Sequence, residues 1–143
     1  MSTSQNKEAV RRLNEATNKG DLKMLDGLFD ASFVSHTSPE MKGPEAMKQS
    51  QAALRSAFPD YHEKIEHMVA EEDMVAAFYT LTGTFKGKYQ DIAPTGKRFS
   101  VPLAVLSRFV NGKQVESWLY MNSLDWYRQL GIPVPEAQMV GAR

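Results

Sequence analysis

A run of alternating aromatic and hydrogen-bonding residues near the end of the chain carries the side chains best suited to chemistry. Residues 113–121 mix β-branched, aromatic and polar types without Gly or Pro, a composition that predicts a β-strand. Alternate side chains of a strand point to opposite faces. One of these faces would carry Glu116, Trp118, Tyr120 and Asn122. An indole, a phenol, an amide and a carboxylate in a row suit the wall of a ligand pocket; a solvated outer face is the alternative.

His36 is the best candidate for acid–base chemistry, because an unperturbed imidazole has a pKa of about 6.5. A structural histidine at a strand end is the alternative. Asp125 would reach the same pocket only through a bulge or an early turn, and otherwise caps the segment that follows. Glu116 is equally well explained by solvation or by an ion pair with a base such as Arg108.

Metal ions and cofactors are not expected. His62 and His67 would fall on opposite faces of one strand, without ligand spacing to His36, and the sequence has no cysteine. There is no phosphate-cradling loop, nucleotide fingerprint or nucleophile elbow. Any chemistry would therefore use side chains alone.

Length and charge narrow the class of protein. The 143 residues suit one domain, with flexible tails expected over residues 1–4 and about 134–143. The 17 basic and 17 acidic residues balance, so no field would gather nucleic acid or an anionic membrane. No stretch has the apolar character of a signal peptide or the length of a membrane span. We expect a soluble cytoplasmic protein.

The elements that position these residues change from helices to strands along the chain. Apolar spacing predicts helices over about 4–20, 21–29 and 44–58, with Gly20 ending the first and Pro44 beginning the third. A short strand is predicted at 33–36, and a period of two predicts strands from residue 61 onward. Asn111-Gly112 predicts a type I′ hairpin. We therefore expect an α+β domain, with three N-terminal helices packed over a curved antiparallel sheet.

The strand predicted over 99–110 is apolar on both faces. One face carries Leu103, Val105 and Phe109, and the other carries Ala104, Leu106 and Val110. Helices can cover only one side of the sheet, so we expect a second copy of the chain to cover the other in a two-fold homodimer. A long strand buried within a monomer is the alternative.

Short motifs over nearly the whole chain resemble the SnoaL-like polyketide cyclases, a branch of the nuclear transport factor 2-like superfamily. They occur in the family's order, at residues 18–21, 33–36, 43–45, 58–60, 72–75, 83–84, 94–97, 111–113, 116 with 118, and 129–131. The resemblance implies a cone-shaped α+β barrel, with a deep apolar pocket between sheet and helices and dimerisation through the sheet.

The resemblance also implies a chemistry, the closing of a ring by aldol condensation on a polyketide ester. A pocket carboxylate removes a proton and later returns it, without a metal or an organic cofactor. In this chain Asn122 occupies the carboxylate's position, four residues after Trp118, and Phe85 stands where the family tends to place a histidine. His36 matches the family's histidine on the first strand. An amide can position a carbonyl or donate to an oxyanion, but it cannot act as the base.

These residues lead to the hypothesis that the pocket binds a small, mostly apolar carbonyl compound, with cyclase- or isomerase-type proton transfer as its chemistry. His36 would act as acid or base, Asn122 and Tyr120 would hydrogen-bond the enolate, and Trp118 and Phe85 would contribute to the substrate-binding wall.

The missing carboxylate leaves open whether the protein is an enzyme at all. The alternative is a non-catalytic small-molecule-binding or dimerisation module of the same fold. An epoxide hydrolase would need Asp125, Asp73 and Arg108 as a water-activating set, which their spacing does not indicate.

Overall fold

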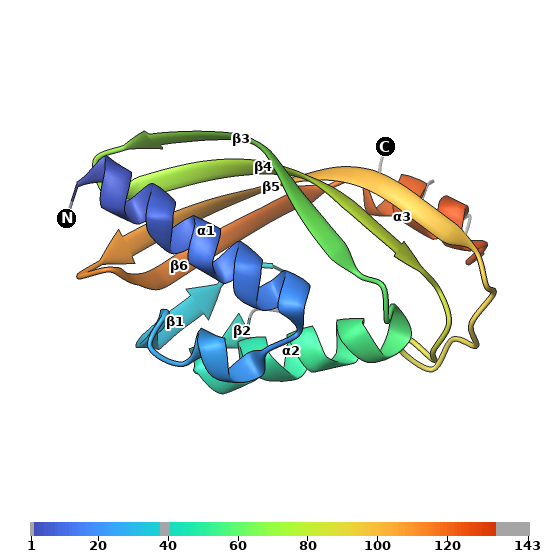
Figure 1. The fold of residues 1–143 in the computed structure, drawn as a ribbon. Coiled ribbons are helices and arrows are strands. Elements are labelled where there is room, and N and C mark those ends of the chain that lie inside the picture. The colour runs from blue at the N-terminus through green and yellow to red at the C-terminus, as the bar shows by residue number, and fades with distance from the viewer. Residues whose placement is uncertain (1, 38–40, 134–143) are drawn as a thin grey trace.

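A curved sheet with helices on one side forms the molecule, seen in a computed structural model that describes residues 2–37 and 41–133 (Figure 1). The helices are α1 (Thr3–Lys19), the single 3-10 turn η1 (Leu22–Leu25), α2 (Gly43–Ala57) and α3 (Ser123–Leu130). The strands are β1 (Phe29–Ser35), β2 (Met41–Lys42), β3 (His62–Glu71), β4 (Met74–Thr84), β5 (Arg98–Val110) and β6 (Lys113–Met121). The tail expected over 134–143 lies outside the described residues, whereas α1 already begins at Thr3.

The six strands form one open sheet in the order β2-β1-β6-β5-β4-β3. Neighbours are antiparallel, except that β1 runs parallel to β6. The α+β fold class is confirmed, with a sheet that is mixed and not closed. Figure 1 shows α1 and α2 on the same side of the curved sheet.

The helices begin and end at residues with the expected capping chemistry. Ser2 and Gln5 form a capping box at the start of α1, and Gly20 ends the helix at φ 68°. Pro44 lies in the first turn of α2. The second predicted helix is wrong in length: Asp21 caps only one 3-10 turn, and Phe29 already begins β1.

The predicted Asn111-Gly112 hairpin is confirmed. Both residues have positive φ, 51° and 79°, as a type I′ turn requires. This turn pairs β5 with β6 from Val110 and Lys113 onward. The hairpin therefore fixes which residues of β6 face the helices.

A bulge in β3 decides which of its side chains point inward. Pairing with β4 shifts register between Ile65 and His67. Before the shift Glu63 and Ile65 are partly buried on the inner face, and after it Val69 is 60% exposed on the outer face. A single alternation along the strand, as the sequence suggested, does not survive this bulge.

Four aromatic side chains pack together at the end of the molecule near α3. Phe58 lies 5.4 Å from Phe85, 5.2 Å from Phe99 and 5.9 Å from Trp126, measured between ring centroids. Phe58 and Phe85 are fully buried. Gly83 fits against this cluster, because an added Cβ would lie 2.9 Å from the Phe99 ring. The cluster gives the interior a rigid apolar end.

Candidate active site

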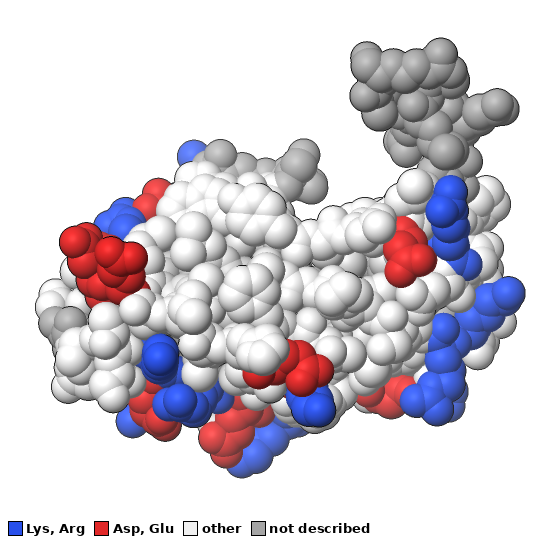
Figure 2. All heavy atoms as spheres, turned by 90° about the horizontal axis from the view of Figure 1, so that it is seen from above, with Lys and Arg blue, Asp and Glu red and all other residues white. Residues whose placement is uncertain are grey.

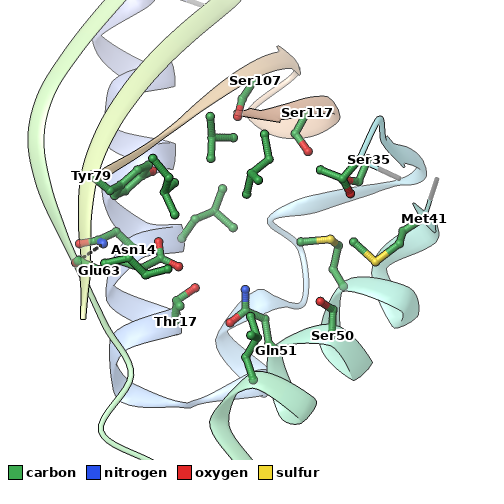
Figure 3. A pocket seen from close by; sticks show the side chains of 18 of the residues that line it. Asn14, Thr17, Ser35, Met41, Ser50, Gln51, Glu63, Tyr79, Ser107 and Ser117 are labelled. Carbon is green, nitrogen blue, oxygen red and sulfur yellow. Dashed lines mark hydrogen bonds between the residues drawn. The ribbon is translucent and has the colours of Figure 1, made fainter. Parts of the chain in front are cut away.

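A cavity of about 280 Å3 lies between the inner face of the sheet and helices α1 and α2 (Figure 3). Most of its lining is apolar and comes from elements along the whole chain, including Val10, Leu54, Leu103 and Met121. Its volume is close to the lower end of the range of roughly 300–1,000 Å3 that is typical of ligand sites. The cavity therefore suits a small, mostly apolar ligand.

Glu63 is the one charged side chain on the described wall of this cavity. Its Oε1 accepts a hydrogen bond from the Tyr61 hydroxyl at 3.0 Å. Burial raises the pKa of the Glu63 carboxyl above its ordinary value, and the Tyr61 hydrogen bond and the positive charge of Arg55 oppose that rise only in part. A carboxylate with a raised pKa beside an apolar cavity has the properties of a general base.

Arg55 is held behind this carboxylate by main-chain carbonyl groups. Its guanidinium donates to the carbonyl of Tyr61 at 3.1 Å, to that of Pro59 at 3.4 Å, and to that of Thr17. It also lies 5.8 Å from the centroid of the Tyr61 ring. These contacts fix a positive charge near Glu63 while leaving the carboxylate on the cavity wall.

Two asparagines of α1 fix the backbone of Glu63. The Nδ2 atoms of Asn14 and Asn18 donate to the Glu63 carbonyl at 2.8 and 2.9 Å, and the Glu63 N–H donates to Asn18 Oδ1 at 2.8 Å. Because β3 is an edge strand, these amides replace the neighbour that a central strand would have. Figure 3 shows Asn14, Glu63 and Tyr79 on the same side of the cavity.

The predicted orientation of the β6 face is wrong. Trp118, Tyr120 and Glu116 do share one face, but the described cavity is lined from β6 by the opposite face, through Ser117, Leu119 and Met121. Tyr120 is 60% exposed.

The outer face instead brings several predicted residues together. The His36 ring stacks on Trp118 at 4.9 Å, and its Nε2 lies 3.1 Å from Glu116 Oε1. Arg108 Nε donates to the other Glu116 oxygen at 2.6 Å, as the sequence reading of this pair allowed. The hydrogen bonds from Arg108 and His36 lower the pKa of Glu116. This cluster lies across the sheet from the cavity.

Asn122 and Phe85 also lie off the described cavity wall. Asn122 is the N-cap of α3, where its Oδ1 accepts the backbone N–H of Asp125 at 3.0 Å. Asp125 therefore does not cap this helix, and its carboxylate accepts from Gln129 at 2.9 Å. Phe85 belongs to the buried aromatic cluster. The catalytic or binding roles assigned to these residues and to His36 stay predictions.

Sequence reasoning missed Glu63, although a signal for it was present. Glu63 stands midway between Tyr61 and Ile65, in the stretch where a period of two predicts a strand, so the three side chains share one face. A lone carboxylate on an apolar face is costly to bury and so points to function. Its neighbours in sequence, His62 and Lys64, are exposed.

The described residues hold no metal-binding constellation, since no three His, Cys, Asp or Glu side chains gather in them. No helix within the described ranges combines the length and the apolar composition that crossing a membrane requires.

Comparisons with known proteins agree on one family. Residues 7–130 match the model of the family described as SnoaL-like polyketide cyclase. The aklanonic acid methyl ester cyclase DnrD of Streptomyces peucetius is 31% identical over 134 residues, covering 90% of this chain and 92% of that protein. The cyclase DauD of Streptomyces sp. (strain C5), which has the same activity name, is 33% identical over 135 residues, covering 90% and 83%.

Solved structures share the fold of this chain. AclR of Streptomyces galilaeus, described as a putative hydroxylase, superposes with a TM-score of 0.81 at 29% identity, covering 99% of this chain and 91% of that one. TsrD of Streptomyces laurentii superposes with a TM-score of 0.85 at 25% identity, covering 93% and 99%.

Proposed function

Because the chain belongs to the SnoaL-like polyketide cyclase family, we propose that its interior cavity binds a small, mostly apolar carbonyl compound and catalyses proton transfer of the cyclase type. The observation that carries this proposal is Glu63, a carboxylate with a raised pKa on the wall of the cavity. It can supply the base that Asn122 cannot.

The proposed reaction balances with Glu63 as both base and acid. Its carboxylate takes a proton from a carbon flanked by two carbonyl groups, and the electron pair left behind is delocalised as an enolate. That carbon attacks another carbonyl carbon of the same molecule, so a C–C bond forms and the C=O π pair moves onto oxygen. The resulting alkoxide takes the proton back from Glu63, which restores the carboxylate.

Glu63→Gln tests this proposal. Glutamine keeps the size of the side chain and an acceptor for Tyr61, but it cannot take a proton. Turnover should fall by about 10²–10⁴-fold with little change in KM. Aklanonic acid methyl ester, named for the relatives, and smaller bicyclic β-keto esters are the compounds to assay.

His36→Ala is the matched control, because His36 lies on the outer face of the sheet and should leave turnover unchanged. Loss of turnover in His36→Ala, with unchanged turnover in Glu63→Gln, would indicate that His36 and not Glu63 transfers the proton. Binding of these esters by the wild-type protein without turnover or proton exchange would support the non-catalytic module instead.

We also infer that the protein forms a two-fold dimer through the outer face of the sheet. Phe78, Ala104 and Tyr120 lie in register across β4, β5 and β6 on that face. Phe78 and Tyr120 are 42% and 60% exposed. An apolar row of this kind in the middle of a sheet suits a self-complementary interface.

A further inference from the structure

The Tyr79 hydroxyl is an unused hydrogen-bond donor beside Glu63. Tyr79 lies on the inner face of β4, paired with Ile65 and two residues before Leu81, the partner of Glu63. The side chain is only 8% exposed and lines the cavity. Within the described part of the chain the Tyr79 hydroxyl makes no hydrogen bond. Its oxygen is nevertheless not fully buried. The oxygen therefore keeps accessible surface, on a side chain that lines the cavity.

Both other tyrosines on the described cavity wall already make one hydrogen bond through the hydroxyl group. The Tyr61 hydroxyl donates to Glu63, and the Tyr89 hydroxyl accepts from Gln90 at 3.4 Å. Burial, and after it the negative charge of Glu63, raises the pKa of Tyr79. Tyr79 therefore stays a neutral donor at neutral pH, close enough to Glu63 to sense its charge.

We propose that Tyr79 donates a hydrogen bond to the substrate oxygen that becomes negative when Glu63 removes the proton. The substrate class that fits both groups is a ketone or β-dicarbonyl compound whose acidic C–H lies next to the accepting oxygen. The two side chains come from neighbouring strands and lie on one side of the cavity (Figure 3). This inference rests on the proposed function of Glu63.

The physical basis is a difference between ground state and transition state. A hydrogen bond to an oxygen that carries negative charge is roughly twice as strong as one to a neutral carbonyl. Tyr79 would therefore stabilise the enolate more than the substrate, and the gain would appear in kcat rather than in KM.

The test uses 2-naphthol, a planar aromatic enol, as the probe. After proton transfer, the enolate faces a protonated Glu63 carboxyl. The neutral amide of Glu63→Gln mimics that protonated carboxyl. Adding Tyr79→Phe to this variant should weaken 2-naphthol binding, measured by calorimetry, by about 10- to 100-fold. It should also raise the pKa of the bound naphthol, read from its absorbance. Adding Tyr127→Phe, in α3 and off the described cavity wall, should change neither.

The outcomes separate this inference from the proposed function. Full turnover in Glu63→Gln would overturn both. Loss of turnover in Glu63→Gln, with unchanged naphthol affinity and unchanged kcat in Tyr79→Phe, would overturn the role of Tyr79 alone. If Tyr79→Phe fails to fold, 3-fluorotyrosine at position 79 replaces it: its more acidic hydroxyl should tighten naphthol binding, and unchanged or weaker binding would contradict the proposal.

Discussion

Glu63 is held where an ionised carboxylate is unfavourable. The carboxyl has one hydrogen bond from Tyr61, and its pKa is raised mainly because burial disfavours the charged form. A carboxyl with a raised pKa in the folded state binds its proton more tightly there than in the unfolded chain. Between the ordinary pKa and the raised one, the free energy of unfolding therefore falls as pH rises. Glu63 thus lowers stability at neutral pH, a cost that the proposed catalytic role would explain.

Glu63→Gln should therefore raise the Tm at pH 8, where Glu63 is ionised and the amide removes the buried charge. The difference between variant and wild type should shrink as pH falls through the raised pKa and vanish near pH 4, where both side chains are neutral. Thermal unfolding followed by circular dichroism across this pH range measures it. A variant less stable than wild type at pH 8 would show that the charge of Glu63 is well compensated.

For single residues, the sequence predicts which side chains share a face of a strand better than it predicts which face points to the interior. The alternation of Glu116, Trp118 and Tyr120 was right, but the pocket lies on the opposite face. The sequence of β5 does not indicate which face is inside, because both faces of this strand are apolar. Aromatic character was a poor guide, since an interface between subunits also favours aromatic residues.

Helix α1 acts on the site through one of its faces. Asn14 and Asn18 are one turn apart, so both amides point at the same peptide of β3 and hold Glu63 at the cavity. The helix thereby serves as a neighbour for the edge strand as well as a cover for the sheet. Placement of the carboxylate depends on this contact, which spans 45 residues of sequence.

Asn18→Ala should destabilise the protein by about 1–3 kcal/mol, because the N–H of a partly buried residue loses its partner. Turnover should also fall, mainly in kcat, since Glu63 keeps its chemistry but loses its fixed position. Urea denaturation and steady-state kinetics measure the two effects. Glu15→Ala, at an exposed site on the same helix, should alter neither; equal effects from both variants would indicate a general loss of α1.

Local signals predict elements well where backbone chemistry is decisive. The left-handed Gly20, the Pro44 helix start and the Asn111-Gly112 hairpin were all predictable because few residues tolerate those conformations. The parallel pairing of β1 with β6 and the bulge after Ile65 were not, because they arise from contacts between distant segments.

At the scale of the whole molecule, the two faces of the sheet differ in their surroundings. The inner face surrounds the cavity, and the outer face is apolar in its middle. Figure 2 views that outer face, with Lys, Arg, Asp and Glu gathered mainly along its rim. A formal net charge of zero provides little long-range repulsion between copies of the chain.

Phe78→Asp should therefore convert a dimer into a monomer. Near a two-fold axis each substitution appears twice, so two carboxylates would be buried close together in place of two aromatic rings. Sedimentation velocity at micromolar concentration measures the change, with Gln90→Asp as a control that adds the same charge in the loop between β4 and β5. A wild-type protein that already sediments as a monomer, or a Phe78→Asp variant that remains dimeric, would rule out this face as the interface. Because the cavity lies on the other side of the sheet, the monomeric variant should keep its affinity for 2-naphthol.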